Sequence, residues 1–327
     1  AVQTGRRAVE MAWEDLKPSD FMTEKSIDNG LMASLAIGGS TNAIVHLIAI
    51  AGRLGINLSL DRFDELSRST PVLADIRPSG RFLMEDFFNA GSLSAMLARM
   101  TDLLNLECLT VSGATLAEQI KDAYVIDDEV IRTRENPVAE AGGTCLLRGN
   151  LAPNGCVIKS VAADPDLLQH RGPAVVFDNY PAMKEGIHDP DLDVDENSVL
   201  VLRGCGPRGY PGMPEVSNMA LPKKLLEKGI VDLVRICDGR MSGTAFGTVV
   251  LHVSPEGAVG GPLSKLQNGD VITINALTGS LTVALTDEEL AVRKEAWSGP
   301  RETIYASGAL WKYAQLVGST RLGAVTH

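Results

Sequence analysis

The 327-residue sequence lacks three features: an apolar run long enough to span a membrane, an excess of positive charge, and any Cys-x-x-Cys pair. A membrane helix needs about 20 consecutive apolar residues, so no such helix is expected. The net charge of −11 argues against nucleic acid or an anionic membrane as a partner. The five cysteines are odd in number and widely spread, which indicates reduced thiols in a cytoplasmic protein rather than a disulfide scaffold.

What is present describes an ordinary soluble protein, with 45% hydrophobic and 22% charged residues. A chain of this length can bury large cores and is expected to hold two domains. Its first residues, AVQTGRRAVEMAWED, have helical spacing and do not resemble a signal peptide. The absence of an initial Met is what a fragment or a processed chain would show.

The first part of the sequence predicts helices. Thr23 is a suitable cap for a helix that runs to about Leu35, and Ser40 or Thr41 caps another over residues 42–53. That second helix is apolar nearly all round, so we expect it to be buried, with His46 as a hydrogen-bonded core histidine. The GGSTN turn before it could hold an anion on its free N–H groups, although a plain helix cap is the favoured interpretation. Further helices are expected after Ser59, near 82–89, near 92–100 and from Thr115, and CLTVSG at 108–113 is expected to be a strand.

The second part changes character. Residues 124–137 are charged, lack clear periodicity and end in Asn-Pro, which marks a linker. After it, short runs rich in Val and Ile are bounded by Gly, Pro, Asn and Asp, as strands are. These runs are TCLLRG, CVIKSV, AVVFDN, SVLVLRG, VDLVRIC, GTVVLHV, DVITINA and SLTVAL. With helices at about 222–228, 286–297 and 307–316, they predict a barrel or curled sheet that carries helices on its outside.

Residues 203–244 hold two glycine-rich turns, RGCGPRGYPGMPE and CDGRMSGT. Glycine clusters cost folding entropy and let the backbone approach a ligand closely, so they need a reason. The first turn carries Glu215, whose carboxylate suits Mg²⁺, although spacing alone favours a solvated loop glutamate. The second carries Ser242, which is displaced by one position from a G-x-S-x-G nucleophile elbow and has no neighbouring His and Asp. On spacing alone, its hydroxyl is expected to form hydrogen bonds within its own turn.

The runs GPRGYPGMPE and CDGRMSGTAFGTVVLHVSPE are long and unusual, and on them the sequence resembles the dehydratases of dihydroxy acids and sugar acids. The resemblance extends from GRRAVEMAWEDLKPSD to GAVTH and covers the later part of the family's usual length. It implies an α/β fold: the helix-rich tail of an α/β domain over residues 1–123, the linker 124–137, and a swivelling-type β/α barrel over residues 138–327.

The resemblance also implies roles for single residues. Glu215 of the GMPE motif would bind the family's Mg²⁺, Ser242 would be the catalytic base, and Thr244 would help to fix the substrate. In the branched-chain-precursor dehydratases Gly is expected where Thr244 stands, so this sequence is closer to the sugar-acid branch, which acts on acids such as arabinonate or xylonate. His327 would bind substrate, because sugar-acid members end in a similar histidine that turns back into the active site, although chain ends are usually disordered.

Two cofactors are implied by the family: Mg²⁺ and an iron–sulfur cluster held by three cysteines. Those cysteines, and the Asp and modified lysine that complete the Mg²⁺ site, are expected upstream of residue 1. None of Cys108, Cys145, Cys156, Cys205 and Cys237 is therefore expected to be a cluster ligand, and the last four read as small buried residues. The implied reaction is dehydration of a sugar acid to a 2-keto-3-deoxy acid, in a homo-oligomer that is a dimer or a tetramer.

Four alternatives stay open at this stage. A 6-phosphogluconate dehydratase is less favoured, because the sequence shows no extra basic cradle for a phosphate. The same chemistry would serve the dihydroxy-acid dehydratase of branched-chain amino acid synthesis, in a more apolar pocket. A non-catalytic chain, either a stable fragment or an assembly module without the cluster, is a rival of another class. A swivelling carrier domain with a phosphohistidine ranks last, because no histidine lies in an obvious glycine-flanked exposed turn; His252 reads as a structural residue of a strand.

Overall fold

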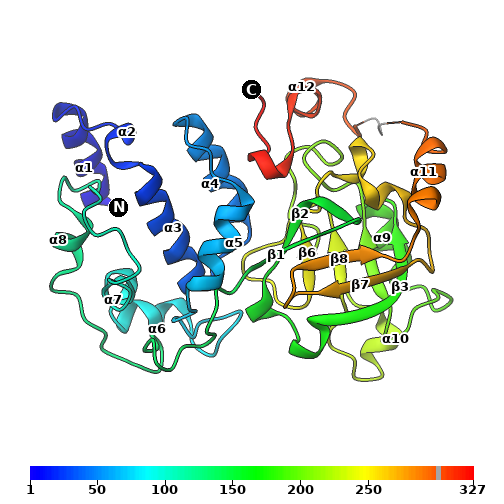
Figure 1. The fold of residues 1–327 in the computed structure, drawn as a ribbon, viewed down its shortest axis with the longest axis horizontal. Helices are drawn as coiled ribbons and strands as arrows, with labels where there is room; N and C mark the ends of the chain where they lie inside the picture. The colour runs from blue at the N-terminus through cyan, green and yellow to red at the C-terminus, as the bar shows by residue number, and fades with distance from the viewer. Residues whose placement is uncertain (300–302) are drawn as a thin grey trace. The chain divides into compact units, whose positions relative to one another are not determined.

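The computed structural model describes residues 1–299 and 303–327. These residues form two compact units: unit 1 comprises residues 1–39 and 50–143, and unit 2 comprises residues 40–49 and 144–327. Each unit has its own secondary structure and core, and Figure 1 shows the fold of both. In the described residues, no helix is both long and apolar enough to cross a membrane.

Unit 1 is built from helices and extended loops. Its helices are α1 (Val2–Trp13), α2 (Pro18–Phe21), α3 (Glu24–Ala36), α5 (Leu60–Ser69), α6 (Met84–Asn89), α7 (Ser92–Ala98) and α8 (Leu116–Ile120). The predicted cap Thr23 is confirmed, and the helices expected after Ser59 and from Thr115 begin where predicted. Each of these three side chains accepts a hydrogen bond from a backbone N–H of the first helical turn. The strand expected at 108–113 is wrong, because only Leu109 forms a bridge, to Thr115, across a tight turn.

The core of unit 1 lies between helices and a stretch of extended chain. Leu31 and Leu35 of α3, Leu73 of the extended stretch and Met96 of α7 are fully or almost fully buried. Ile131 is also fully buried, and its neighbour Arg132 donates its N–H to Leu73 O. Residues 124–137, which were predicted to be a linker, thus contribute apolar side chains to this unit.

Helix α4 (Asn42–Arg53) begins where the sequence predicts, but the prediction that it is buried all round is wrong. Ile44, Val45 and Ile48 are buried on one side, whereas His46 and Ile50 are exposed. His46 is hydrogen-bonded, as expected, but it is not a core residue. One side of the helix is therefore accessible, and residues on it can take part in a site.

Unit 2 is a closed barrel, as expected for this α/β fold (Figure 1). Each of the eight apolar runs overlaps one strand, and β2 and β3 begin four and five residues before their runs. The strands are β1 (Cys145–Gly149), β2 (Ala152–Ile158), β3 (Gln169–Phe177), β4 (Val199–Leu202), β5 (Arg235–Cys237), β6 (Val249–Leu251), β7 (Val271–Asn275) and β8 (Ser280–Val283). Around the barrel the order is β1-β2-β6-β5-β4-β3-β7-β8. Within the segment β6-β5-β4-β3 of this order, adjacent strands are parallel to one another. The loops that follow β4 and β5 therefore emerge from the same end of the barrel.

Two apolar clusters hold unit 2 together. One fills the barrel interior with side chains such as Leu147, Val201 and Ile272, all fully buried. The other lies outside the sheet, where Phe177 of β3 packs with Met183 of the helix α9 (Tyr180–Gly186). This short helix was not predicted. The remaining helices are α10 (Lys223–Leu226), α11 (Asp287–Glu295) and α12 (Gly308–Leu316), and α9, α10 and α11 lie outside the barrel in Figure 1.

Candidate active site

The loop of residues 203–222 follows β4, and two buried carboxylates hold its first half. Asp238, at the end of β5, accepts backbone N–H bonds from Gly204 at 3.0 Å and Cys205 at 2.8 Å. Glu256 accepts from the N–H groups of Arg208 at 3.0 Å and Gly209 at 2.9 Å. Because these donors are backbone groups, the two carboxylates fix the course of the main chain itself.

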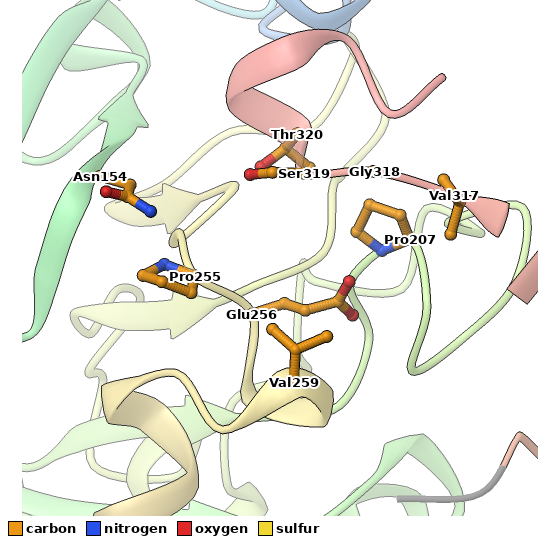
Figure 2. A pocket seen from close by; sticks show the side chains of 9 residues that line it. All are labelled: Asn154, Pro207, Pro255, Glu256, Val259, Val317, Gly318, Ser319 and Thr320. Atoms are coloured by element: carbon orange, nitrogen blue, oxygen red, sulfur yellow. The ribbon is translucent and has the colours of Figure 1, made fainter. Parts of the chain in front are cut away.

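A glycine is required where this loop passes Glu256. A Cβ atom at Gly206 would lie only 2.5 Å from Glu256 Oε2. Burial, together with the nearby Asp238, raises the pKa of Glu256 to about 7. Figure 2 shows the Glu256 side chain reaching toward Pro207 in a pocket of about 120 Å³, to which Asn154 and Ser319 also contribute. The glycine-rich sequence therefore serves the close packing of backbone onto a buried acid.

Ser242 lies in the turn that follows β5. Its side chain is half-buried, and its Oγ lies 3.0 Å from Thr244 Oγ1. The Thr244 N–H donates to the same oxygen over 3.5 Å, and the Thr244 side chain is exposed. Two donors from one residue can therefore face the Ser242 oxygen, an arrangement that favours negative charge on it.

Glu215 lies in the second half of the loop, and its side chain is exposed. Its Oε1 accepts a hydrogen bond of 2.5 Å from Asn42 Nδ2. The same Asn42 Nδ2 donates to the carbonyl oxygen of Met241 at 3.1 Å, directly before Ser242. One carboxamide at the start of α4 thus joins the loop of Glu215 to the turn of Ser242.

Arg240 makes a second connection between the same two segments. Its Nε donates to Met213 O at 2.5 Å, and its NH2 group donates to Gly212 O at 3.2 Å. Its NH1 group lies 3.2 Å from His46 Nε2 on α4. The guanidinium is therefore occupied with backbone carbonyls two and three residues before Glu215, which makes it a structural clamp.

The turn also approaches the start of α4 at van der Waals distance. A Cβ atom at Gly243 would lie 2.8 Å from Ser40 Cβ. Only glycine at position 243 allows this approach, which places Ser40 beside the CDGRMSGT turn.

His252 supports the turn from inside. It directly follows β6, its N–H donates to Gly239 O at 3.0 Å, and its side chain is buried. Burial lowers its pKa to about 3, with further contributions from Arg240 and His46. A histidine that stays neutral across the physiological range is a packing residue here, as the sequence suggested.

His327 does not come together with the other candidates through any described contact. Its side chain is exposed, and none of the hydrogen bonds or ion pairs found among the described residues involves it. The segment before it is nevertheless held in place, because Gly318 N donates to Val325 O at 2.8 Å. Gly323 packs against α4, where an added Cβ would lie 2.6 Å from Ala49 N.

Glu215 fits a partial Mg²⁺ site. One of its oxygens is held by Asn42, and Mg²⁺ in proteins commonly takes one or two carboxylates together with waters and substrate. Within residues 1–299 and 303–327, no group of three or more His, Cys, Asp or Glu side chains could hold a metal by itself. Glu215 is therefore compatible with the ligand role that the resemblance implies, and that role stays a prediction.

The cysteines do not fit an iron–sulfur cluster. All five are free thiols, and Cys156, Cys205 and Cys237 are buried in unit 2. Burial raises the pKa of Cys156 well above its usual range, and the neighbouring Cys237 together with burial does the same for Cys205. Cluster ligands are thiolates, so the thiols of Cys156 and Cys205 are packing residues. Cys145 is only half-buried, which corrects the expectation that it is a buried residue.

Sequence reasoning proposed Glu215, Ser242 and Thr244 as site residues but did not consider Asn42 and Arg240, which the structure places beside them. Arg240 lies inside a motif that had been noted, and its position two residues before Ser242 was the available signal. Asn42 lies in the GGSTN turn, which had drawn attention only for its backbone N–H groups. The contact between Asn42 and Glu215 spans 173 residues, so nothing local could have indicated it.

Family models for the dihydroxy-acid/6-phosphogluconate dehydratases match both parts of this sequence. The C-terminal model matches residues 129–324, and the N-terminal model matches residues 1–119. The chain therefore belongs to the dihydroxy-acid/6-phosphogluconate dehydratase family, and the expected resemblance is confirmed.

Similar proteins within the family differ in the acid for which they are named. Over 98% of its length the chain is 50% identical to the L-arabinonate dehydratase of Rhizobium leguminosarum. Over 99% it is 45% identical to the 6-deoxy-6-sulfo-D-gluconate dehydratase of Pseudomonas putida, and 42% identical to the dihydroxy-acid dehydratase of Dinoroseobacter shibae. Each alignment covers 56% of the relative, so the chain spans about half the length of the curated relatives it matches.

Proposed function

We propose that this chain forms part of a sugar-acid dehydratase, which converts an aldonate to a 2-keto-3-deoxy acid. The observation that carries the proposal is the Asn42 carboxamide, which hydrogen-bonds both the Glu215 carboxylate and the carbonyl that precedes Ser242. A candidate metal ligand and a candidate base thereby share one support. Higher identity to an arabinonate dehydratase than to a dihydroxy-acid dehydratase supports the substrate class.

In this proposal Ser242 is the base that removes the proton from C2 of the substrate. The Ser242 oxygen must carry negative charge to do so, because a neutral hydroxyl is too weak a base for a carbon-bound proton. The Thr244 hydroxyl and N–H face that oxygen and would stabilise the charge. When the C2 proton moves to Ser242, the electron pair of the C–H bond forms the C2–C3 double bond.

The leaving group is the C3 hydroxyl, which departs with the electron pair of the C3–O bond and takes up one proton to become water. The proton that Ser242 received from C2 balances this uptake, and its release restores the base. The enol that remains at C2 tautomerises to the ketone. No oxidant or reductant is needed, because the reaction redistributes hydrogen and oxygen within one substrate. We propose that the exposed Thr244 hydroxyl binds a substrate oxygen next to Ser242, and that His327 is a further substrate contact.

Glu215 is proposed to hold Mg²⁺, which when bound supplies positive charge for the substrate carboxylate and the C2 hydroxyl. The family's iron–sulfur cluster is proposed to take its cysteines from a part of the family's chain that these 327 residues do not include, since the cysteines here do not fit it. We also propose that the family's homo-oligomeric state, a dimer or a tetramer, applies to this protein.

The experiment is a panel of acids offered to the complete polypeptide, with the 2-keto acid product detected as its semicarbazone. Arabinonate or xylonate should give product, and Ser242→Ala should reduce kcat by about 100-fold to 10,000-fold, the range for a general base. Ser264→Ala is the control, because Ser264 Oγ donates to Gly261 O and accepts from Lys265 Nζ, and none of its described hydrogen bonds involves the Ser242 turn. A Ser242→Ala protein as active as the Ser264→Ala protein would refute the assignment of the base.

The alternatives make different predictions in the same panel. Product from dihydroxyisovalerate alone would indicate the dehydratase of branched-chain amino acid synthesis. A folded, colourless polypeptide that has no iron and acts on none of the acids would indicate a non-catalytic fragment or assembly module. We favour the sugar-acid reaction because position 244 is Thr and not Gly.

A further inference from the structure

We propose that Asn42 is a positioning residue whose carboxamide orients the Glu215 carboxylate toward a divalent cation and ties it to the turn of Ser242. The inference rests on the proposed function, since it needs Glu215 to be a metal ligand. It assigns a role to a side chain that lies 173 residues away from Glu215 in the sequence.

The chemistry of the contact requires a carboxamide. Its NH₂ group has two hydrogens, and Asn42 uses one for Glu215 Oε1 at 2.5 Å and the other for Met241 O at 3.1 Å. A hydroxyl has a single hydrogen and could serve only one of these acceptors. An ionised carboxylate at position 42 would have no hydrogen for either.

Asn42 is itself held rigidly. It is the first residue of α4, and its backbone N–H donates to Ser40 Oγ at 3.2 Å. Ser40 in turn touches the Ser242 turn at Gly243, where a Cβ would lie 2.8 Å from Ser40 Cβ. The amide therefore projects from a helix end that is already packed against the turn, so its direction is set before any ligand binds.

The oxygen of the same carboxamide lowers the stability of the fold, and the proposed role of Asn42 accounts for this cost. In the part of the chain that the structure describes, Asn42 Oδ1 is buried without a hydrogen-bond partner. Leaving a buried acceptor unsatisfied is destabilising, so a residue chosen for stability alone would not be an asparagine. The two hydrogen bonds that Asn42 donates to Glu215 and Met241 offset this destabilisation.

The contact with Asn42 restricts the direction in which the Glu215 carboxylate points. None of the described hydrogen bonds involves its Oε2, whereas Oε1 is engaged by a neutral donor. A neutral donor leaves the full negative charge on the carboxylate while it restricts side-chain rotation. Partners that orient a metal ligand in this way typically change metal affinity by about 10-fold to 100-fold when they are removed.

The test is the affinity of the complete polypeptide for Mn²⁺, followed by electron paramagnetic resonance of the free ion. Mn²⁺ prefers the same oxygen ligands as Mg²⁺. Asn42→Ala and Asn42→Leu should both bind Mn²⁺ about 10-fold to 100-fold more weakly than the wild type. The leucine variant keeps the size and branching of the side chain, so it also covers the case in which the alanine variant fails to fold.

Two further variants separate the possible outcomes. Glu215→Gln should lose more affinity than either Asn42 variant, whereas Asn150→Ala should keep wild-type affinity. Asn150 is a matched control in the same unit, because its carboxamide also makes two bonds, both to the backbone of Val283.

Wild-type Mn²⁺ affinity in both Asn42 variants, with loss in Glu215→Gln, would overturn the role of Asn42 and leave the proposed function standing. Wild-type affinity in Glu215→Gln would remove the metal role of Glu215, and with it the basis of this inference. Equal loss in the Asn150→Ala and Asn42→Leu proteins would mean that the effect is general destabilisation, and would also overturn the proposal.

Discussion

The buried Glu256 makes the stability of unit 2 depend on pH in a direction opposite to that of most carboxylates. Burial and the neighbouring Asp238 raise its pKa from an ordinary 4.5 to about 7. A raised pKa means that the folded protein binds this proton more tightly than the unfolded chain does. Its contribution is therefore most favourable below about pH 4.5, and stability is lost as the pH rises to about 7.

The size of the effect follows from the shift. The difference of about 2.5 pKa units corresponds to about 3 kcal/mol, at 1.36 kcal/mol for each unit. The residue is only 8% exposed, so solvent does little to screen it. Asp238 is fully buried and its pKa is also raised, so its contribution has the same sign and must be removed by comparison with a variant.

The variant is Glu256→Gln, which keeps the shape and one acceptor but cannot ionise. Urea unfolding of the wild type and the variant should be measured between pH 4.5 and 8. The variant should gain about 3 kcal/mol relative to the wild type as the pH rises through that range. The exposed Glu227→Gln is the control and should show no such trend. A pH-independent difference between the Glu256→Gln protein and the wild type would refute the reasoning.

Two further predictions concern the contacts around the Ser242 turn. Gly243→Ala should move the turn away from Ser40 and lower kcat by at least about 10-fold, since small misplacements at a reacting centre are costly. The control is Gly52→Ala, whose added Cβ would meet nothing within 4 Å and should leave kcat unchanged. Equal kcat in both variants would contradict the prediction. Arg240→Lys keeps the charge but loses the forked contacts to Met213 and Gly212, so thermal unfolding should occur at a lower temperature, by an amount equivalent to about 1–3 kcal/mol. An unchanged unfolding temperature would show that the clamp is dispensable.

Much of the fold could be predicted from local sequence. The Val- and Ile-rich runs became barrel strands because β-branched side chains suit a pleated, buried surface. The helix starts at Thr23 and Ser59 could be recognised because a cap needs only a side-chain oxygen and the next few N–H groups. The errors occurred where local preference was weak: CLTVSG forms a turn closed by Ala114, and α9 is a helix of two turns that packing on β3 stabilises.

The residues of the candidate site could be predicted from the sequence only in part. Glu215 and Ser242 came from their motifs, because spacing alone favoured a solvated glutamate and a turn serine. Their roles, like those of Thr244 and His327, stay predictions until the variants are measured. The burial of α4 was judged from composition, which cannot tell how many sides of a helix will meet a partner.

The sequence by itself determined the α/β class, the strands of the barrel, the helix caps and the dehydratase family, because each depends on neighbouring residues or on a continuous motif. Only the tertiary structure decided that Asn42 reaches Glu215, that Arg240 clamps the same loop, and that Glu256 is buried beneath it. These contacts join segments from 27 to 173 residues apart. They form because barrel closure brings the loops after β4 and β5 to one end, where α4 begins.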